Sequence, residues 1–345
     1  MVKKFIKVAA AILIPIICLA GLQRLLVPKY VENIPEGSMI EEYYKSGKGN
    51  DVIFIGDCEV YENISPVTMW EEYGITSYVR GSADQYIWQS YYLLEDTLKY
   101  ETPKAVVVSI LSVRNNEADN EAYNRMTIDG MKWSASKINA IRSSMTDEET
   151  FASYIFPILR YHSRWNELTA EDFKYFFTKP SVTTKGYLMQ VGVRPVTTVP
   201  RVPVLPDYTF SEKNMEYLKK MKELCDEKGV ELVLFKAPSI YPHWYDEYDS
   251  QIVEFANKNN LMYINALKDV DEIGIDFTTD TFDYGQHLNV QGAEKLSKYL
   301  GKVLDNKYNL DDHRSDAEIS KEWEAVVRQY NSEKETKTKK WEAEQ

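Results

Sequence analysis

The sequence predicts an α/β fold built on a parallel sheet, and three observations support this prediction. Short apolar runs alternate with longer segments of helical periodicity, which is the pattern of repeated βαβ units. Residues 105–111 form a nearly continuous β-branched run, as expected of a strand buried on both faces. The first apolar run, 52–55, ends abruptly at Gly56-Asp57-Cys58, and parallel sheets commonly present reactive residues at such strand ends.

The composition is that of a globular protein. The 345 residues are 44% hydrophobic and 27% charged, enough for a sizeable core in one large domain with an insertion or in two domains. The formal net charge is −12, and residues 1–30 contain basic residues but no acidic ones, so the rest of the chain is more acidic still. This charge argues against nucleic acid as a partner.

A basic start followed by an apolar run predicts a membrane anchor over residues 1–30. Three lysines precede the uncharged residues 8–22, which is the arrangement of a secretory signal or a signal anchor. Cleavage after Ala20 is one alternative, and an uncleaved single-pass anchor is the one we favour. The N-terminus would then lie inside and the body on the extracytoplasmic face.

After a linker at 31–50, the α/β domain is expected over residues 51–310. Its expected strands are 52–55, 75–79, 105–111, 230–235 and 261–264. Its expected helices are 66–73, with Ser65 as the N-cap, 84–100, 211–228, 246–259 and 289–304. About five parallel strands with helices on both faces make a three-layer α/β/α sheet of the flavodoxin-like type.

Residues 117–210 interrupt this alternation and are predicted to be an insertion. Residues 117–178 read as several helices rich in aromatic side chains, whereas 179–210 are extended and rich in proline. A long segment of this kind is expected to form a cap that shapes the binding surface. Residues 311–345 form a charged tail, part of which is expected to dock as a helix before residues 334–345 fray.

Cysteine and histidine usage points to a thiol rather than to a metal site. The three cysteines, Cys18, Cys58 and Cys225, form no CxxC pair, and the chain has four histidines. A zinc cluster is therefore not expected, nor is an organic cofactor. A disulfide between Cys58 and Cys225 is disfavoured because Cys225 lies in a helical pattern remote from Cys58.

Cys58 is the candidate nucleophile, with Asp283 and His287 as its partners. At a strand-to-helix turn, amide N–H groups and a nearby imidazole are expected to lower the pKa of the thiol. If the loop before the last helix curls, Asp283 can accept from one ring nitrogen of His287 and leave the other facing Cys58. The alternatives are that Cys58 is a small buried thiol and that Asp283 and His287 cap the following helix.

These residues resemble the motifs of the SGNH (GDSL-type) hydrolases. The match consists of Gly56-Asp57-Cys58 after the first strand, Gly81 after the second, and Asp283 with His287-Leu-Asn before the last helix. The anchor, the insertion and the Tyr/Trp-rich segment after the first strand resemble more narrowly the membrane-anchored members, such as DltD and the AlgX/AlgJ-like proteins. The resemblance covers roughly residues 50–305 and implies acyl transfer onto cell-envelope polymers through Cys58, Asp283 and His287.

The sequence departs from the family pattern at two points. The family nucleophile is normally Ser, and Cys58 stands in its place. The usual Gly-x-Asn-Asp after the third strand is absent, and the segment there ends in Asn115 and Asn116. By the resemblance, one of these asparagines would donate to the oxyanion together with the amides of Cys58 and Gly81. The alternative is that both asparagines simply form a turn.

Two segments are candidate substrate contacts. Arg164 and Trp165, in the insertion, offer a cation and a stacking surface for a sugar or a phosphate-bearing polymer, although an ordinary amphipathic helix also explains them. Lys236, His243 and Trp244 follow the fourth strand at its carboxyl end, where parallel sheets bind ligands.

The sequence thus predicts an extracytoplasmic acyl hydrolase or O-acyltransferase. Its substrate would be an ester-linked acyl group, chiefly acetyl, on a cell-envelope polysaccharide or other polymer, and a membrane-embedded acyltransferase is a second expected partner. The alternative is a catalytically lapsed protein of the same fold that binds a glycan or docks to such an acyltransferase. A thiol-dependent lipase is less favoured because the insertion is aromatic and polar rather than a broad apolar lid.

Overall fold

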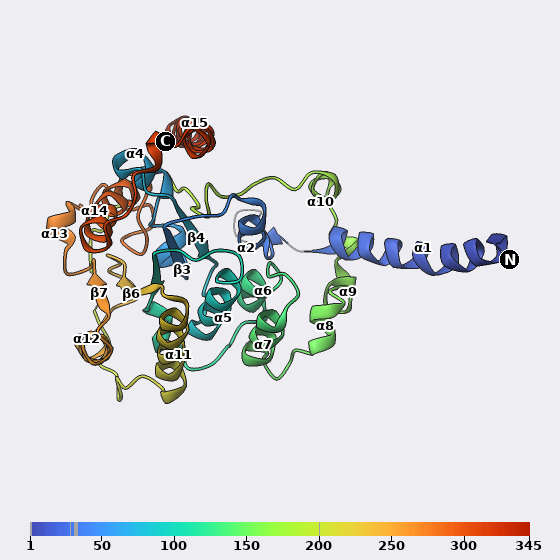
Figure 1. Cartoon of the computed structure of the whole chain (residues 1–345), viewed down its shortest axis with the longest axis horizontal. Helices are drawn as coiled ribbons and strands as arrows, with labels where there is room; N and C mark the ends of the chain where they lie inside the picture. Colours follow the sequence, from blue (N-terminus) through green and yellow to red (C-terminus); the bar gives the residue numbers. More distant parts are fainter. Residues whose placement is uncertain (1, 28, 31–33, 200) are drawn as a thin grey trace.

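The core of the molecule is a five-stranded parallel sheet (Figure 1). A computed structural model describes residues 2–27, 29–30, 34–199 and 201–345, and within them the strands lie in the order β4-β3-β5-β6-β7. The strands are β3 (Val52–Gly56), β4 (Ser77–Gly81), β5 (Ala105–Ser109), β6 (Glu231–Lys236) and β7 (Met262–Asn265). All neighbours in this sheet are parallel, and the order is that of flavodoxin-like sheets. The predicted fold class is therefore confirmed.

A few predicted features extend beyond the described chain. Residues 1 and 28 of the predicted anchor, 31–33 of the predicted linker and 200 of the predicted insertion lie outside the described residues.

Helices cover both faces of the sheet because successive strand side chains point to opposite faces. Val52 and Phe54 of β3 pack into one hydrophobic core, whereas Ile53 and Ile55 pack into a second. The first core lies under α4 (Pro66–Tyr73), α14 (Val290–Tyr308) and α15 (Ala317–Ala343). The second lies under α5 (Ile87–Thr97), α11 (Glu212–Lys228) and α12 (Asp246–Asn259). Figure 1 shows these two sets of helices on opposite sides of the sheet, as a three-layer arrangement requires.

Local sequence signals set the ends of several helices. The Ser65 side chain caps α4 by accepting from the Thr68 amide, and Pro66 occupies the first helical position. Gly74 ends this helix in a left-handed conformation with φ of 72°. The predicted bounds of α4 are therefore confirmed.

Short elements complete the described chain. They are β1 (Lys29–Tyr30), β2 (Ile34–Pro35), α2 (Ser38–Glu42), η1 (Tyr43–Lys45), α3 (Cys58–Tyr61), η2 (Leu111–Arg114), α13 (Val270–Ile273) and η4 (His313–Ser315). β1 and β2 pair with each other in an antiparallel ribbon outside the main sheet.

The insertion divides into three parts. The first, α6 (Glu121–Ile128) and α7 (Ala135–Ser144), packs beside α5. The second lies beside the N-terminal helix and consists of α8 (Phe151–Ile155), α9 (Ile158–Tyr161), η3 (His162–Asn166) and α10 (Ala170–Phe177). The third is extended and contacts β4 and α3: the Val79 amide donates to Lys185 O at 2.9 Å, and the Leu188 amide donates to Tyr61 O at 2.8 Å. This extended part therefore borders the edge of the sheet that carries Cys58.

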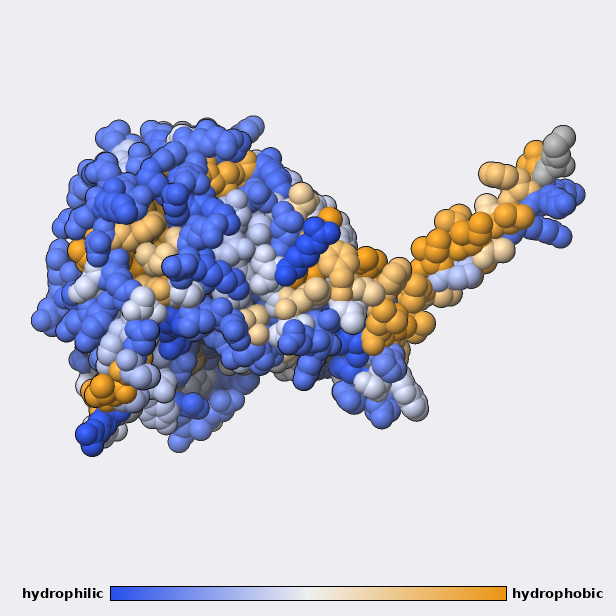
Figure 2. Space-filling view, turned by 90° about the horizontal axis from the view of Figure 1, so that it is seen from below, coloured by the Kyte–Doolittle hydropathy of each residue, from blue (hydrophilic) through white to orange (hydrophobic). Residues whose placement is uncertain are grey.

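Long helices stand at the two termini. α1 (Val2–Leu26) projects from the body as an apolar rod (Figures 1 and 2), and it is long and apolar enough to be a membrane anchor or a signal sequence. α15 continues to Ala343, so the prediction that residues 334–345 fray is wrong. Its end is held because Lys334 forms an ion pair with Glu294 at 2.6 Å and Lys337 donates to Met189 O at 2.8 Å.

Candidate active site

The turn after β3 carries the candidate nucleophile. Asp57 caps α3, with Oδ1 accepting from the Glu59 amide at 3.1 Å, and Cys58 is the first residue of that helix. Gly56 fits because β5 passes very close: a Cβ at this position would lie 2.5 Å from the Ser109 Cβ. A larger residue at Gly56 would therefore push β3 and β5 apart or move the turn.

The surroundings of Cys58 are acidic. The side chain is partly exposed, and burial is the largest cause that raises the pKa of the thiol well above its ordinary value. Four carboxylates add to this effect, in the order Asp57, Glu62, Glu59 and Asp84. The prediction that amides and an imidazole lower the Cys58 pKa is therefore wrong, because burial and then the surrounding negative charge both raise it.

Asp57 itself responds to the same crowding. Burial, and then the neighbouring Glu59 carboxylate, raise the pKa of Asp57 to about 7. A donated hydrogen bond from Ser109 Oγ at 3.2 Å and the charge of Lys236 partly oppose this rise. Asp57 therefore exchanges its proton near neutral pH.

Asp283 and His287 meet in a curled loop ahead of α14. His287 Nδ1 lies 2.6 Å from Asp283 Oδ2, and the His287 amide donates to Asp283 Oδ1 at 2.8 Å. The loop turns sharply at Tyr284 and Gly285, where φ is 65° and 89°. Asn289, rather than Asp283 or His287, caps α14 through bonds from the Gln291 and Gly292 amides. The structure thus has the curled loop, and the capping alternative is wrong.

Glu62 is a functional candidate that the sequence analysis missed. Its Oε2 lies 3.3 Å from His287 Nδ1, so two carboxylates face the same ring nitrogen. Glu62 Oε1 accepts from Gln190 Nε2 at 3.2 Å, which ties this carboxylate to the extended part of the insertion. Its position could have pointed to it: Glu62 stands four residues after Cys58, so in a helix it lies one turn further along, on the same side.

These carboxylates change the titration of the imidazole. Burial disfavours the charged ring, but the hydrogen bond to Asp283 and the charge of Glu62 outweigh this cost. The pKa of His287 is therefore raised above its ordinary value of 6.5. Because Nδ1 faces the carboxylates, Nε2 is the nitrogen left to act on a thiol or a substrate.

Cys58 and His287 share an electrostatic neighbourhood. The charges of Glu59 and Glu62 act on both groups. Asp84, which also acts on Cys58, has a pKa raised by burial, and His287 partly opposes this rise. The Leu288 amide donates to Asn63 Oδ1 at 2.8 Å, so the histidine loop is bonded to the segment that follows α3. Among the described residues, however, no hydrogen bond joins Cys58 Sγ to the His287 ring.

Gly81 lies at the same edge as the nucleophile turn. β3 and β4 are in a register that places Gly81 opposite Gly56, and a Cβ on Gly81 would lie 2.8 Å from Gly56 O. Asn115 follows η2, where its amide donates to Ser112 O and its carbonyl accepts from Asn214 Nδ2 at 2.8 Å. Asn116 is exposed. The oxyanion roles of Gly81, Asn115 and Asn116 stay predictions.

Arg114 is a second residue that the sequence analysis missed. It is the last residue of η2, shortly after β5. Burial raises the pKa of Asp84, and the charge of Arg114 partly opposes this rise. Its buried Nε has no hydrogen-bond partner within the described chain. Arg114 thus adds a cation close to an otherwise acidic edge.

The predicted substrate contacts after β6 have different surroundings. Lys236 is fully buried and forms an ion pair with Glu59, whose other oxygen accepts from the Ala237 amide at 3.1 Å. Trp244 is also buried, and its Nε1 donates to Asp249 at 3.4 Å. Neither side chain is therefore available to a substrate, because the interior satisfies both. His243 is exposed, and its role as a substrate contact stays a prediction.

Arg164 and Trp165 are not brought to this edge of the sheet. Arg164 Nη1 donates to Leu26 O at 2.7 Å, and its other nitrogens lie near Glu167 and Asp172, so η3 is held against the end of α1. Trp165, in η3 beside α1, is 72% exposed. A cavity of about 650 Å³ at the base of α1 is likewise not lined by Cys58 or His287.

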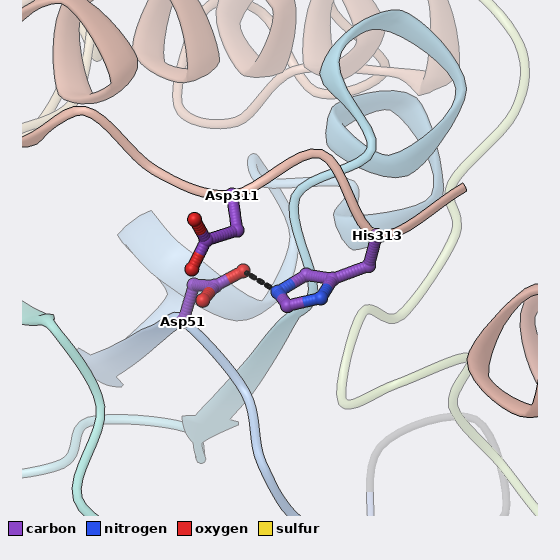
Figure 3. Close-up of side chains that lie close together, drawn as sticks. All are labelled: Asp51, Asp311 and His313. Carbon is purple, nitrogen blue, oxygen red and sulfur yellow. Dashed lines mark hydrogen bonds and ion pairs between the residues drawn. The ribbon is translucent and has the colours of Figure 1, made fainter. Parts of the chain in front are cut away.

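A different cluster could hold a metal ion by composition. Asp51, Asp311 and His313 bring their ligand atoms within 4.8 Å of one another at the amino end of β3 (Figure 3). Asp51 Oδ2 already accepts from His313 Nε2 at 2.9 Å, and Asp311 accepts from Lys104 Nζ at 2.8 Å. The protein's own donors thus satisfy these carboxylates, and the cluster fastens the segment before α15 to the sheet.

Comparisons with known proteins give structural similarity only. No protein-family model and no curated protein matches the chain. One similar solved structure is from Desulfitobacterium hafniense and is provisionally described as a lipolytic protein of the G-D-S-L family. It is 12% identical, with a TM-score of 0.39, over 74% of this chain and 100% of its own.

Two further structures are similar in the same way. An acylhydrolase, provisionally so described, from Bacteroides fragilis is 10% identical with a TM-score of 0.38, over 84% of this chain and 95% of its own. A GDSL-like lipase from Bacteroides thetaiotaomicron is 10% identical with a TM-score of 0.36, over 79% of this chain and 100% of its own.

Proposed function

We propose that this chain is a membrane-anchored acyl hydrolase or O-acyltransferase with a Cys58–His287–Asp283 triad. One observation carries the proposal: the Asp283 carboxylate binds His287 Nδ1 at 2.6 Å, in a loop that is bonded to the segment following the Cys58 helix. A carboxylate on one ring nitrogen, with the other nitrogen left for a nucleophile, is the arrangement that orients a general base.

In the first step, His287 Nε2 takes the thiol proton while Cys58 Sγ attacks the acyl carbonyl carbon. The new C–S bond forms as the carbonyl electrons move onto oxygen, and in this proposal the amides of Cys58 and Gly81 stabilise that oxyanion. The intermediate collapses to a thioester, and the leaving alkoxide takes the proton from His287. His287 Nε2 then takes a proton from water or a sugar hydroxyl as its oxygen attacks the thioester carbonyl. The C–S bond breaks, the acyl group leaves as a carboxylic acid or a new ester, and His287 returns the proton to Cys58 Sγ.

The electrostatics favour proton transfer during attack over a preformed thiolate. Since burial and carboxylates raise the pKa of Cys58, the resting sulfur is a thiol. Asp283 and Glu62 stabilise the imidazolium that forms when His287 accepts the proton. Hydrogen bonds of this kind are often long in the absence of substrate and tighten in the complex.

The same acidity bears on the substrate. Asp57, Glu59, Glu62 and Asp84 surround the thiol, and a negatively charged acyl donor would be repelled by their ionised forms. A neutral ester, such as an acetyl group on a sugar hydroxyl, meets no such repulsion. We therefore propose an acetylated cell-envelope glycan or related polymer as the substrate, with a membrane-embedded acyltransferase as a candidate partner.

The proposed location follows from α1. Its apolar residues are exposed, and lysines precede them, so that the N-terminus would stay inside and the body would lie on the extracytoplasmic face. An anchor followed by an α/β domain with an insertion resembles the architecture of the membrane-anchored DltD and AlgX/AlgJ-like proteins.

A second function is favoured by two specific observations. The pKa of Cys58 is raised, and Sγ is not hydrogen-bonded to the His287 ring among the described residues. Both would suit a catalytically lapsed protein that binds a glycan or docks to an acyltransferase.

Hydrolysis of p-nitrophenyl acetate by the full chain in detergent separates the two functions. The triad proposal expects turnover that is lost in Cys58→Ala and retained in the matched variant Cys225→Ala, whose thiol is buried in α11. Equal rates in the two variants would favour the binding protein.

A further inference from the structure

Six large apolar side chains are exposed on the helices beside α1, and the proposed chemistry uses none of them. This group, here called the collar, consists of Ile155, Phe156, Leu159, Trp165, Phe173 and Phe177. Their exposed fractions run from 44% for Ile155 to 80% for Phe177. Soluble proteins rarely expose large apolar patches to water, so we expect another apolar surface to cover the collar.

The collar adjoins the base of α1. α9, η3 and α10, which carry most of it, all contact α1. A Cβ at Gly21 would lie 3.7 Å from the Phe176 ring, and Arg164 fastens η3 to Leu26 O. Figure 2 shows apolar surface continuing from α1 onto the adjoining part of the body. Whatever surrounds α1 therefore also reaches the collar.

The length of α1 sets the depth at which the collar would lie. Its 25 residues span about 37 Å, whereas the hydrocarbon core of a bilayer is about 30 Å thick. Apolar side chains along it are exposed, for example Ile12 at 57% and Ile16 at 56%. If these residues lie in the hydrocarbon, the last turns of α1, from about Gly21, reach the boundary with the headgroups.

The chemistry of the collar suits that boundary. Trp165 is of the type enriched at membrane interfaces. Phe173 and Phe177 are four residues apart on α10 and share one side of it, whereas Asp172 is buried. Two exposed cations lie nearby: the Arg24 guanidinium is 5.8 Å from the Phe176 ring, and Lys174 follows Phe173 in α10. Such side chains extend toward anionic headgroups.

We propose that the collar docks on the headgroup–acyl boundary of the same bilayer that holds α1. This inference rests on the proposed membrane anchorage. The occupant is lipid rather than a second protein because the collar is continuous with a helix whose exposed side chains are themselves apolar. Docking at two places, α1 and the collar, would fix the orientation of the body on the membrane surface.

The test is the quenching of a fluorophore by brominated lipids. The nitrobenzoxadiazole group is attached at Phe177→Cys, or separately at Leu159→Cys, in the full chain with Cys18→Ser and Cys58→Ser. The protein is reconstituted in phosphatidylcholine–phosphatidylglycerol vesicles. Two matched sites complete the set: Ile12→Cys in α1, and Val253→Cys in α12, which is 40% exposed.

The proposal expects quenching at positions 12, 159 and 177 and none at 253. Quenching at 12 without quenching at 159 and 177 would overturn the collar and leave the anchor intact. A blue shift at 177 that brominated lipid does not quench would show that protein covers the collar, which also overturns the proposal. Absence of quenching at position 12 would overturn the anchorage and, with it, the collar.

Discussion

Two Asp–His pairs stand at opposite ends of β3. At the carboxyl end, Asp283 binds His287 Nδ1 at 2.6 Å in the neighbourhood of Cys58. At the amino end, Asp51 binds His313 Nε2 at 2.9 Å, one residue before the strand begins (Figure 3). The pairs resemble each other in contact distance and differ in what surrounds them.

The surroundings decide what each pair can do. The first pair has a second carboxylate, Glu62, on the same nitrogen and a thiol in the same acidic neighbourhood. The second has Thr76, which donates to Asp51, and Asp311, which is paired with Lys104. A hydrogen-bonded Asp–His pair is thus no evidence of catalysis by itself, because only a third, reactive group gives the imidazole a proton to move.

Removing the imidazole of each pair should give the largest functional difference between the two Asp–His pairs. We expect His287→Ala to lower esterase turnover by about 10²–10⁴-fold, the usual contribution of a general base. His313→Ala should change turnover less than about twofold, since it touches no reacting group. Initial rates with p-nitrophenyl acetate check both variants. Similar losses in the two would mean that the pairs are not functionally distinct.

The cations at the two ends should differ in their effect on stability. Lys236 and Glu59 are fully buried, so we expect Lys236→Met to lower the free energy of unfolding by about 3–5 kcal/mol. The Lys104–Asp311 pair is exposed, and Lys104→Met should cost less than about 1 kcal/mol. Urea unfolding measures both variants. A small effect of Lys236→Met would show that the buried Glu59 carboxylate does not depend on this cation.

Neutralising the carboxylate beside Cys58 should change the reactivity of its thiol, whereas neutralising the carboxylate at the other end of β3 should not. Asp57 raises the pKa of Cys58, so Asp57→Asn should lower that pKa and speed alkylation by iodoacetamide, while Asn keeps the helix cap. Asp51→Asn is the matched control and should leave the alkylation rate of Cys58 unchanged. An unaltered rate in Asp57→Asn would show that its charge does not act on the sulfur.

The same variant should alter the pH dependence of stability. The pKa of Asp57 is raised from 3.8 to about 7 in the folded state, so wild-type stability should fall as pH rises through this interval. Asp57→Asn should lack this loss, so its stability compared with the wild type should be higher at pH 8 than at pH 4. Thermal unfolding across this range is the measurement, and parallel curves for the two proteins would contradict the shift.

The smallest expected effect concerns Glu62. Its charge helps to raise the pKa of His287, so Glu62→Gln should lower that pKa and move the acid limb of the pH–rate profile to lower pH. Because the pKa is raised, the charged ring stabilises the folded state at low pH, and this contribution is lost as pH rises through the folded pKa. A profile that keeps its midpoint would show that Glu62 has only a structural role.

The fold was predictable because its signals are local. The parallel strands follow from apolar runs, and helix ends follow from Ser65-Pro66 and Gly74. The meeting of Asp283 with His287 was also predictable, since they stand four positions apart in one loop. Tail helix α15 was predicted too short because Glu294 and Met189, which hold its end, lie far away in the sequence.

The environment of the site was not predictable in the same way. Lys236 meets Glu59 across 177 residues, and no local pattern distinguishes a buried ion pair from a cation at a pocket wall. Arg164 likewise reads as a surface cation until α1 is placed beside it. The pKa of Cys58 is raised first by burial, which only the folded chain provides, and three of the four carboxylates that add to it, Asp57, Glu59 and Glu62, are sequence neighbours whose effect the sequence analysis did not weigh.

The most direct test of the triad is to trap the acyl-enzyme. The full chain is mixed with an activated acetyl ester, quenched in acid, and digested for mass spectrometry of the Cys58 peptide. The account predicts an acetyl thioester on Cys58 in the wild type and in His313→Ala, and a strongly reduced amount in His287→Ala. An unmodified Cys58 in the wild type, or equal acetylation in all three proteins, would contradict it.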